Sequence, residues 1–144
     1  MTTLHSVSGI PLEGMRYEKR DHLAIITLDR PERGNSLTPE MHRAMRAVWR
    51  DVQLDPEVRV AIITGAGDRH FCTGADVGRV AATGRVSQRS GPLHAEVFWS
   101  PIHAKVLKPV ICAVNGACVG GGLHFVADSD IVLSVPDARF YTPM

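Results

Sequence analysis

The sequence predicts one α/β domain in which parallel strands alternate with helices. Apolar runs typical of strands buried on both faces occur at 58–64, 110–114 and 131–135. A stretch with helical periodicity at 38–53 precedes the first of these runs, and a Gly-rich turn follows the second. Strand, helix, strand, Gly-rich turn, helix and strand in this order is typical of an α/β fold.

Length and composition exclude several classes of protein. The 144 residues suffice for one domain, and 44% apolar with 22% charged residues is typical of a soluble globular protein. A net charge of +1 argues against a broad basic surface for nucleic acids. Neither a signal peptide nor an apolar stretch of bilayer length is recognisable, and the three cysteines form no CxxC pair. We therefore expect a cytoplasmic protein with reduced cysteines and no membrane contact.

The N-terminal part divides into a leader and a strand pair. Residues 1–14 are small, polar and punctuated by Gly and Pro, so we expect a flexible leader before a core domain at 15–144. Strands are expected at 15–19 and 22–28, joined by a turn near Arg20-Asp21.

The clearest helix of the chain is expected at 38–53, after a loop rich in Pro, Gly and Asn at 29–37. Thr38 is a favourable N-cap, and Pro39 suits the first helical position. One apolar stripe recurs at helical spacing and is expected to face the core: Met41, Ala44, Met45, Val48, Trp49 and Val52. Asp55-Pro56 ends the helix.

The second part of the chain alternates apolar segments with loops. We expect a long loop at 65–78, a mobile polar segment at 79–92, and a helix at 94–107 that Pro101 interrupts. Beyond the strand at 110–114 we expect a Gly-rich turn at 115–122, a helix that begins at Leu123, the strand at 131–135 and a short strand at 139–141.

Two loops carry the chemistry of the sequence, because each brings small residues to the carboxyl end of an apolar strand. They are Cys72-Thr73-Gly74-Ala75-Asp76 and Gly120-Gly121-Gly122. Open α/β sheets bind ligands at this end, and small residues let backbone N–H groups approach a ligand. One amide from each loop, converging on a carbonyl oxygen, would stabilise negative charge there. The Gly run alone is equally compatible with a flexible turn or close packing, and it matches neither a P-loop nor a dinucleotide fingerprint.

Three segments, in this order and spacing, resemble the crotonase (enoyl-CoA hydratase/isomerase) family across most of residues 16–144. They are HLAIITLDRPERGNSL, VRVAIITGAGDRHFCTGADV and KPVICAVNGACVGGGLHFVADSDIVLSVPDARFYTPM. The resemblance implies a spiral of ββα units, here incomplete at the C-terminus. It also implies coenzyme A as part of a thioester substrate, without a permanently bound cofactor.

The same resemblance implies roles for individual residues. The amides of Ala75 and Gly121 match the family's oxyanion hole, which polarises the thioester carbonyl and stabilises an enolate. Arg33 and Ser36 fall where the family contacts CoA. Four further positions match acyl-pocket or pantetheine contacts: Thr73, Asp76, Val77 and Gly120.

Both glutamates that family hydratases use as acid and base are replaced. His124 occupies the first position and Met144 the second. Methionine cannot exchange a proton, whereas histidine, with an unperturbed pKa of roughly 6.5, suits acid–base work near neutrality. For His124 we keep three readings open: a catalytic group, an idle side chain that lines the pocket, or a residue buried elsewhere. Ordinary hydration of an enoyl-CoA is therefore not expected.

Other polar residues have simpler structural interpretations. We expect Asp128 and Asp130 to support the scaffold, and Cys72 and Cys118 to act as small apolar fillers. His42 is expected on the outer side of the 38–53 helix. No histidine has ligand spacing typical of a metal site, so we expect no bound metal.

Two functions from different classes follow from these observations. The first is an acyl-CoA enzyme that isomerises, hydrolyses or cleaves its substrate through an enolate. The second is a non-catalytic acyl-CoA-binding or assembly protein, such as a degenerate paralogue or one half of a split enzyme. Family members are considerably longer, so we expect a homo-oligomer, trimer-based by the resemblance, or a complementary polypeptide as partner.

Overall fold

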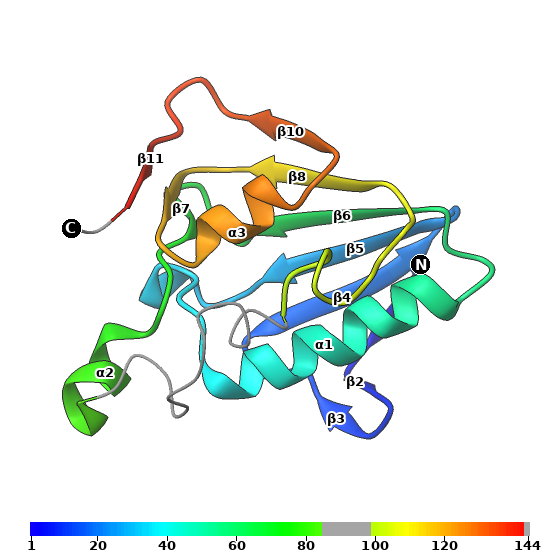
Figure 1. Cartoon of the computed structure of the whole chain (residues 1–144), viewed down its shortest axis with the longest axis horizontal. Coiled ribbons are helices and arrows are strands. Elements are labelled where there is room, and N and C mark those ends of the chain that lie inside the picture. The colour runs from blue at the N-terminus through cyan, green and yellow to red at the C-terminus, as the bar shows by residue number, and fades with distance from the viewer. Residues whose placement is uncertain (85–98, 143–144) are drawn as a thin grey trace.

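The computed structural model describes residues 1–84 and 99–142, which fold around a six-stranded mixed sheet (Figure 1). The strand order is β1-β4-β5-β6-β8-β10. The bounds of these strands are Thr2–Leu4 (β1), Met15–Arg20 (β4), Leu23–Leu28 (β5), Val60–Gly65 (β6), Val110–Val114 (β8) and Ile131–Ser134 (β10). All the strands expected at 15–28, 58–64, 110–114 and 131–135 are thus confirmed, with ends shifted by one or two residues.

Strands β5, β6, β8 and β10 are parallel, as expected for the 58–64 and 110–114 segments. The register aligns Ile26, Ile63 and Cys112 across the sheet, and all three side chains are fully buried. Strand β4 runs antiparallel to β5, because Asp21 and His22 form a tight turn with positive φ at both positions, as two-residue hairpin turns require.

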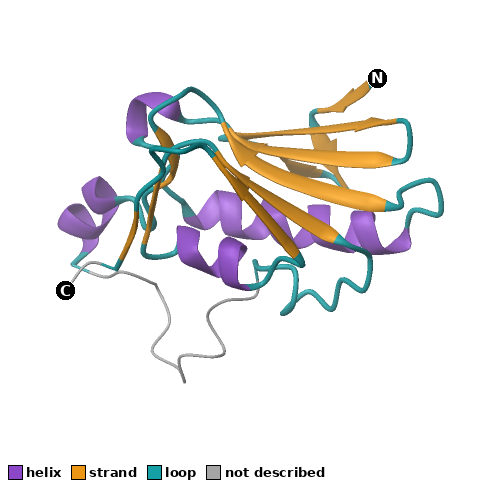
Figure 2. Cartoon of the chain, turned by 90° about the horizontal axis from the view of Figure 1, so that it is seen from above, coloured by secondary structure: helices purple, strands orange, loops and turns teal. Residues whose placement is uncertain are grey.

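Helix α1 (Pro39–Leu54) confirms the strongest expectation from the sequence. The Thr38 hydroxyl accepts a hydrogen bond from the Met41 amide at 3.2 Å, so Thr38 is the N-cap. Every member of the expected apolar stripe is buried. Figures 1 and 2 show α1 and the short helix α3 (Gly122–Ala127) against the same face of the sheet. The core therefore lies between this face and the two helices.

Residues 1–14 differ from the expected flexible leader. Thr2, Thr3 and Leu4 of β1 pair with β4 at the edge of the sheet, and a hairpin of β2 (Ser6–Val7) and β3 (Ile10–Pro11) follows. The side chains of Val7 and Leu12 are buried against the core. Their burial, together with the backbone pairing, explains why this segment is ordered despite its polar composition.

A second sheet of three short strands was not expected. It has the order β11-β9-β7, with bounds Phe140–Tyr141 (β11), Ala117–Val119 (β9) and His70–Cys72 (β7). The expected loop at 65–78 therefore contains β7, and the expected turn at 115–122 contains β9. Each strand is three residues long or shorter, so its formation depends on pairing with partners distant in sequence.

The segments between the two sheets also differ in part from expectation. The start of the polar segment expected at 79–92 belongs to helix α2 (Val77–Thr83). Of the helix expected at 94–107, residues 99–105 form turns and a bend instead, while residues 85–98, which include the rest of both segments, lie outside the described part of the chain. The Trp49 indole N–H donates to the Trp99 carbonyl at 2.7 Å, so buried packing against α1 holds the turns in place.

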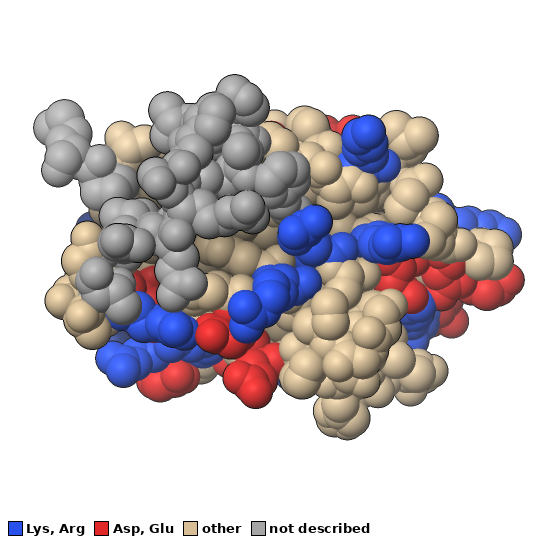
Figure 3. Space-filling model, turned by 60° about the horizontal axis from the view of Figure 1, so that its bottom comes forward, with Lys and Arg blue, Asp and Glu red and all other residues tan. Residues whose placement is uncertain are grey.

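Charge is mixed along the visible part of the molecular surface. Figure 3 shows Lys and Arg side chains interspersed with Asp and Glu, without a broad field of one sign on the face it displays. Within the described residues, no helix is both long and apolar enough to cross a membrane.

Candidate functional site

The two Gly-rich loops meet at their backbones, beyond the carboxyl ends of the parallel strands. A Cβ added to Gly74 would lie 3.0 Å from the Gly121 nitrogen and 3.1 Å from the Val119 carbonyl oxygen. Gly74 also has φ +85°, a conformation that residues with a side chain rarely adopt. Glycine is therefore required at position 74 for the loops to approach this closely.

The Ala75 and Gly121 amides both lie at this junction. In the described part of the chain, neither N–H group donates a hydrogen bond to a backbone carbonyl, although their neighbours do. Leu37 donates to the Gly74 carbonyl at 2.7 Å, and Asp76 donates to the Leu37 carbonyl at 3.1 Å, so the Ala75 backbone is held on both sides. The convergence of the two amides on one oxygen position stays a prediction.

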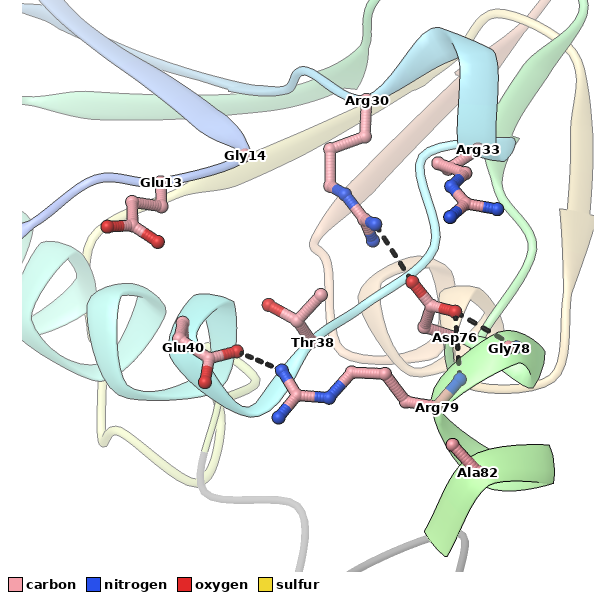
Figure 4. A pocket seen from close by; sticks show the side chains of 10 residues that line it. All are labelled: Glu13, Gly14, Arg30, Arg33, Thr38, Glu40, Asp76, Gly78, Arg79 and Ala82. Carbon is pink, nitrogen blue, oxygen red and sulfur yellow. Dashed lines mark hydrogen bonds and ion pairs between the residues drawn. The ribbon is translucent and has the colours of Figure 1, made fainter.

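A cavity of about 710 Å³ opens beside these loops, between the start of α1 and the start of α2 (Figure 4). Its lining is strongly charged and comprises Glu13, Gly14, Arg30, Arg33, Thr38, Glu40, Asp76, Gly78, Arg79 and Ala82. Arg33, which is exposed at the end of the short 3₁₀ helix η1 (Pro31–Arg33), and Asp76 are the two expected CoA-contacting residues in this lining. Arginine forks suit phosphate groups, so this cavity is chemically able to hold a phosphorylated ligand.

The Asp76 carboxylate is engaged by the protein on both oxygens. Oδ2 accepts from the Arg30 guanidinium at 2.8 Å, while Oδ1 accepts from the amides of Gly78 at 3.0 Å and Arg79 at 3.3 Å. Asp76 is therefore the N-cap of α2. Its bond to Arg30 is the main reason that its pKa lies below the ordinary value. These contacts favour a structural role for the Asp76 side chain over direct ligand contact.

The other expected contact residues lie around the same junction, with different exposure. Ser36 is buried, and its hydroxyl accepts from Arg30 at 3.2 Å. Thr73 is half-buried, and its hydroxyl donates to the Gly34 carbonyl at 3.1 Å. This bond joins the loop at 29–37, which contains η1 (the η1 loop), to the loop at 72–76 (the Ala75 loop). Val77 is 74% exposed at the start of α2, and Gly120 takes φ +53° just before the Gly121 amide.

His124 is exposed on the first turn of α3 and contacts an aromatic cluster. Its ring meets the edge or face of Trp99 at a centroid distance of 5.5 Å and an interplanar angle of 85°. The Trp99 indole also stacks on His42 at 5.2 Å and approaches within 3.6 Å of a Cβ position at Gly121. The reading of His124 as buried elsewhere is therefore wrong, whereas the catalytic and idle readings both stay open.

His42 was expected on the outer side of its helix, and this expectation is wrong. The side chain is half-buried because it stacks on Trp99. This burial lowers the pKa of His42 to about 4, although the nearby Glu40 carboxylate acts in the opposite direction. His42 is consequently neutral at pH 7 and behaves as part of the aromatic packing.

The structural interpretations of two cysteines and one aspartate are confirmed. Cys72 and Cys118 are fully buried, and burial raises the pKa of both thiols. Asp130 accepts a hydrogen bond from the Val110 amide at 2.8 Å and so supports the start of β8. Asp128 lies with one carboxylate oxygen 3.9 Å from the His103 ring, whose Nδ1 is 2.7 Å from the buried Ser100 hydroxyl.

Three residues that organise the site were not singled out from the sequence: Arg30, Asn35 and Asn115. Arg30 joins Ser36 to Asp76, while the two asparagines bind backbone groups between the strand ends. The only local signal was the position of Asn35 after Gly34 in a loop, and both residues have positive φ. Their partners are distant in sequence, so only the folded chain reveals these roles.

Comparison with known proteins places the chain beside one family. The family model for enoyl-CoA hydratase/isomerase matches residues 18–144. An (E)-benzylidenesuccinyl-CoA hydratase of Thauera aromatica is 39% identical over 132 residues, covering 85% of this chain and 47% of the relative. A 1,2-epoxyphenylacetyl-CoA isomerase of Escherichia coli is 39% identical over 120 residues, covering 80% and 45%.

The solved structures agree with this result. An enoyl-CoA hydratase/isomerase from Mycobacterium paratuberculosis has a TM-score of 0.75 and 36% identity, and the match covers 92% of this chain and 49% of that protein. The expected crotonase-like fold is thereby confirmed. The chain spans about half the length of the curated relatives it matches.

The buried His42 ring generates a prediction about pH and stability. Its pKa is about 4 in the folded protein and about 6.5 when unperturbed, so between these values the unfolded chain binds more protons. Stability is therefore expected to fall as the pH falls from 6.5 to 4, with part of the loss due to His42. In His42→Phe, which keeps a stacked ring without a titrating group, the free energy of unfolding should depend less steeply on pH in this window.

Urea unfolding at several pH values between 7 and 4 measures this dependence. His5→Phe is the matched control, because it makes the same substitution at an exposed histidine that has no ring contact with Trp99 in the described structure, so its slope should stay closer to that of the parent protein than the slope of His42→Phe. Identical slopes for His42→Phe and the parent would contradict the role assigned to this ring.

Proposed function

Because the chain belongs to the enoyl-CoA hydratase/isomerase family, we propose that it binds an acyl-CoA thioester and stabilises the enolate of that thioester. The observation that carries this proposal is the junction of the two Gly-rich loops. There the Ala75 and Gly121 amides lie on touching backbones without backbone acceptors in the described residues. Amides held in advance at such a position stabilise developing oxyanion charge without reorganising during the reaction.

The charged cavity supplies a site for the nucleotide part of CoA in this proposal. Arg33 is exposed in its lining, and Arg79, although paired with Glu40 at 2.7 Å, also lines the cavity. Guanidinium groups bind phosphate oxygens through charge-assisted hydrogen bonds. The cavity adjoins the Ala75 loop through Asp76, so a ligand held there would lie next to the proposed oxyanion hole.

Proton transfer is the part of the chemistry with the fewest candidates. The position of His124, exposed and three residues after Gly121, supports it as the proton carrier. The second family carboxylate is replaced by Met144, which has no titrating group. A single proton carrier suits isomerisation, hydrolysis or carbon–carbon cleavage through an enolate. The two carboxylates by which family hydratases add water are absent from these positions.

A non-catalytic acyl-CoA-binding or assembly role remains the second proposal. It is favoured by the replacement of both family glutamates, the first by His124 and the second by Met144. Three free cysteines, all buried, support a reducing setting such as the cytoplasm for either function.

The Gly121 amide provides the test of the main proposal. Gly121→Pro removes the N–H, and the φ of −56° at this position is one that proline adopts. Loss of one oxyanion-hole donor typically lowers kcat by roughly 10²–10³-fold, so any enolate chemistry should fall by this order. The infrared frequency of a ¹³C-labelled thioester carbonyl, lowered when acetyl-CoA binds the parent protein, should return toward its value in water.

Gly121→Ala is the matched control, because a Cβ there would meet its neighbours at ordinary distances, 3.4 Å from Leu37 and 3.5 Å from Gly74. It keeps the N–H and should retain the carbonyl shift. The proposal fails if acetyl-CoA binds the parent protein without any shift, or if Gly121→Pro preserves the full shift.

Hydration itself should be negligible. Each positioned acid–base group contributes typically 10²–10⁴-fold to rate, and here one of the two is absent and the other is replaced by histidine. Crotonyl-CoA hydration, followed by the loss of its ultraviolet absorbance, is expected to be slower than in a family hydratase by at least about 10²-fold. Any residual activity should disappear in His124→Ala, and turnover equal to that of an ordinary hydratase would contradict the expectation.

Among the described residues, no strand pairs with the outer edge of β10, and we expect self-association of this chain. Parallel registers align Ile25, Ile62, Ile111 and Ile131 across the face opposite α1, and Ile131 is 52% exposed. Leu133, two residues further on the edge strand β10, is 59% exposed. Exposed apolar side chains beside an unpaired strand edge favour contact with a second chain.

Sedimentation velocity at several concentrations tests this expectation. Leu133→Lys should shift the distribution toward monomer, whereas Leu107→Lys, at a position that is 86% exposed away from β10, should not. A parent protein that stays monomeric at all concentrations would exclude self-association and leave a complementary polypeptide as the partner to seek.

A further inference from the structure

Arg30 connects the two loops that carry the expected ligand contacts. It lies two residues beyond β5, and its side chain is 18% exposed. Nη1 donates to the Ser36 carbonyl at 2.7 Å and to the Ser36 hydroxyl at 3.2 Å, while Nη2 donates to Asp76 Oδ2 at 2.8 Å. One guanidinium thus binds both Ser36, shortly after η1, and Asp76, the residue that follows Ala75. Figure 4 shows the bond to Asp76.

The backbone of the same segment is organised around Arg30. Its amide donates to the Asn35 side chain at 2.9 Å, and its carbonyl accepts from the amides of Arg33 at 2.8 Å and Asn35 at 2.9 Å. The η1 loop is therefore closed on Arg30 before the side chain reaches Asp76. A shift of Arg30 would move the loop that holds Arg33 and Ser36.

Asp76 transmits this constraint to the amide at position 75. Its side chain is 10% exposed, and its second oxygen binds the first amides of α2. Together with the Asp76 amide, which donates to the Leu37 carbonyl at 3.1 Å, these bonds fix the peptide directly after Ala75. Charge-assisted bonds in a setting this enclosed are stronger than neutral ones and hold a more defined geometry.

Arg30 donates from Nη1 to the carbonyl and hydroxyl of Ser36 and from Nη2 to Asp76, and its side chain is 18% exposed, which distinguishes it from the exposed Arg33 in the same cavity lining. Three of its five N–H groups are thus engaged by the protein, which leaves fewer donors for a phosphate than a guanidinium without such partners has. Its geometry is that of a brace between loops, with the ligand-facing role left to its neighbours.

We propose that Arg30 is a positioning residue which, through Asp76 and Ser36, holds the Ala75 amide in line with the thioester carbonyl. This inference rests on the proposed acyl-CoA function. Arg30 does not touch the reacting atoms; it sets where the Ala75 amide points relative to the loop that carries Arg33. The two sites, nucleotide and carbonyl, are thereby kept at a constant separation.

Two variants separate positioning from folding. Asp76→Asn keeps a residue that caps helices well but removes the charge that Arg30 binds. Arg30→Lys keeps the positive charge but cannot donate to Ser36 and Asp76 with a planar fork. Arg16→Lys is the matched control, because Arg16 binds Asp29 at 2.9 Å in a more exposed ion pair, with side chains 48% and 36% exposed.

Binding of free coenzyme A by calorimetry and the infrared shift of ¹³C-labelled acetyl-CoA are measured on the whole protein. In Arg30→Lys and Asp76→Asn, the affinity for free coenzyme A should change by no more than about threefold. The carbonyl shift should shrink clearly, and the preference for acetyl-CoA over free coenzyme A should fall by roughly tenfold, which corresponds to 1.4 kcal/mol. Arg16→Lys should retain both properties of the parent.

Each other outcome overturns the inference. A full carbonyl shift in both variants would show that the brace does not orient the amide. A tenfold or larger loss of affinity for free coenzyme A in Arg30→Lys alone would make Arg30 a phosphate ligand. Absence of a carbonyl shift in the parent protein would refute the proposed function and, with it, this inference. A shift in the parent protein that both variants retain would refute the inference alone.

Discussion

Two asparagine side chains hold together the strand ends on which the candidate site is built. Asn35 is fully buried and donates to the carbonyls of Ala66 at 2.9 Å and His70 at 2.8 Å. Asn115 accepts from the Gly65 amide at 3.1 Å and donates to the same His70 carbonyl at 3.2 Å. Backbone groups beyond the last pair of a parallel ladder need such partners, because an unpaired buried amide or carbonyl costs about 1–3 kcal/mol.

This amide network depends on the absence of a side chain at one position. A Cβ on Gly65 would lie 2.6 Å from the Phe71 carbonyl and 2.8 Å from the side chains of both Asn35 and Asn115. Gly65 is the last residue of β6, so this strand ends where the side-chain amides of Asn35 and Asn115 lie against its backbone. The loop after β5 and the turn before β9 are thereby anchored to one centre, and the loops that carry Ala75 and Gly121 extend from it.

The site combines tightly fixed backbone with exposed side-chain chemistry. The Gly74–Gly121 contact, the Arg30–Asp76 bond and the Thr73–Gly34 bond all constrain backbone positions. His124, the one residue singled out as a proton carrier, is instead exposed, and its ring contacts Trp99. Such an arrangement suits the proposed recognition of a thioester carbonyl, because the backbone groups that would bind the carbonyl oxygen are held in place by the fold.

The sequence by itself determined the elements whose information is local. The apolar stripe of α1 follows from a periodicity of 3.6 residues, and its Thr38 cap follows from residue type. The runs that form β5, β6 and β8 follow from their apolar and β-branched content. The folded chain confirms each of these elements. The two Gly-rich loops were recognised as candidate ligand loops for the same reason, since small residues after a strand are visible in any window. The resemblance of three ordered segments then identified the family.

Tertiary structure alone decided what depends on partners far apart in the chain. Strands β7 and β9 are too short to have a periodicity, and they form because His70 pairs with Ala117 and Cys72 with Cys118, partners far apart in sequence. Residues 1–14 are ordered by the edge of β4 and by burial of Val7, and His42 is neutral because Trp99 covers it. Arg30 has no local feature that distinguishes it from other arginines; its role comes from Asp76, 46 positions away, which only folding brings within 2.8 Å.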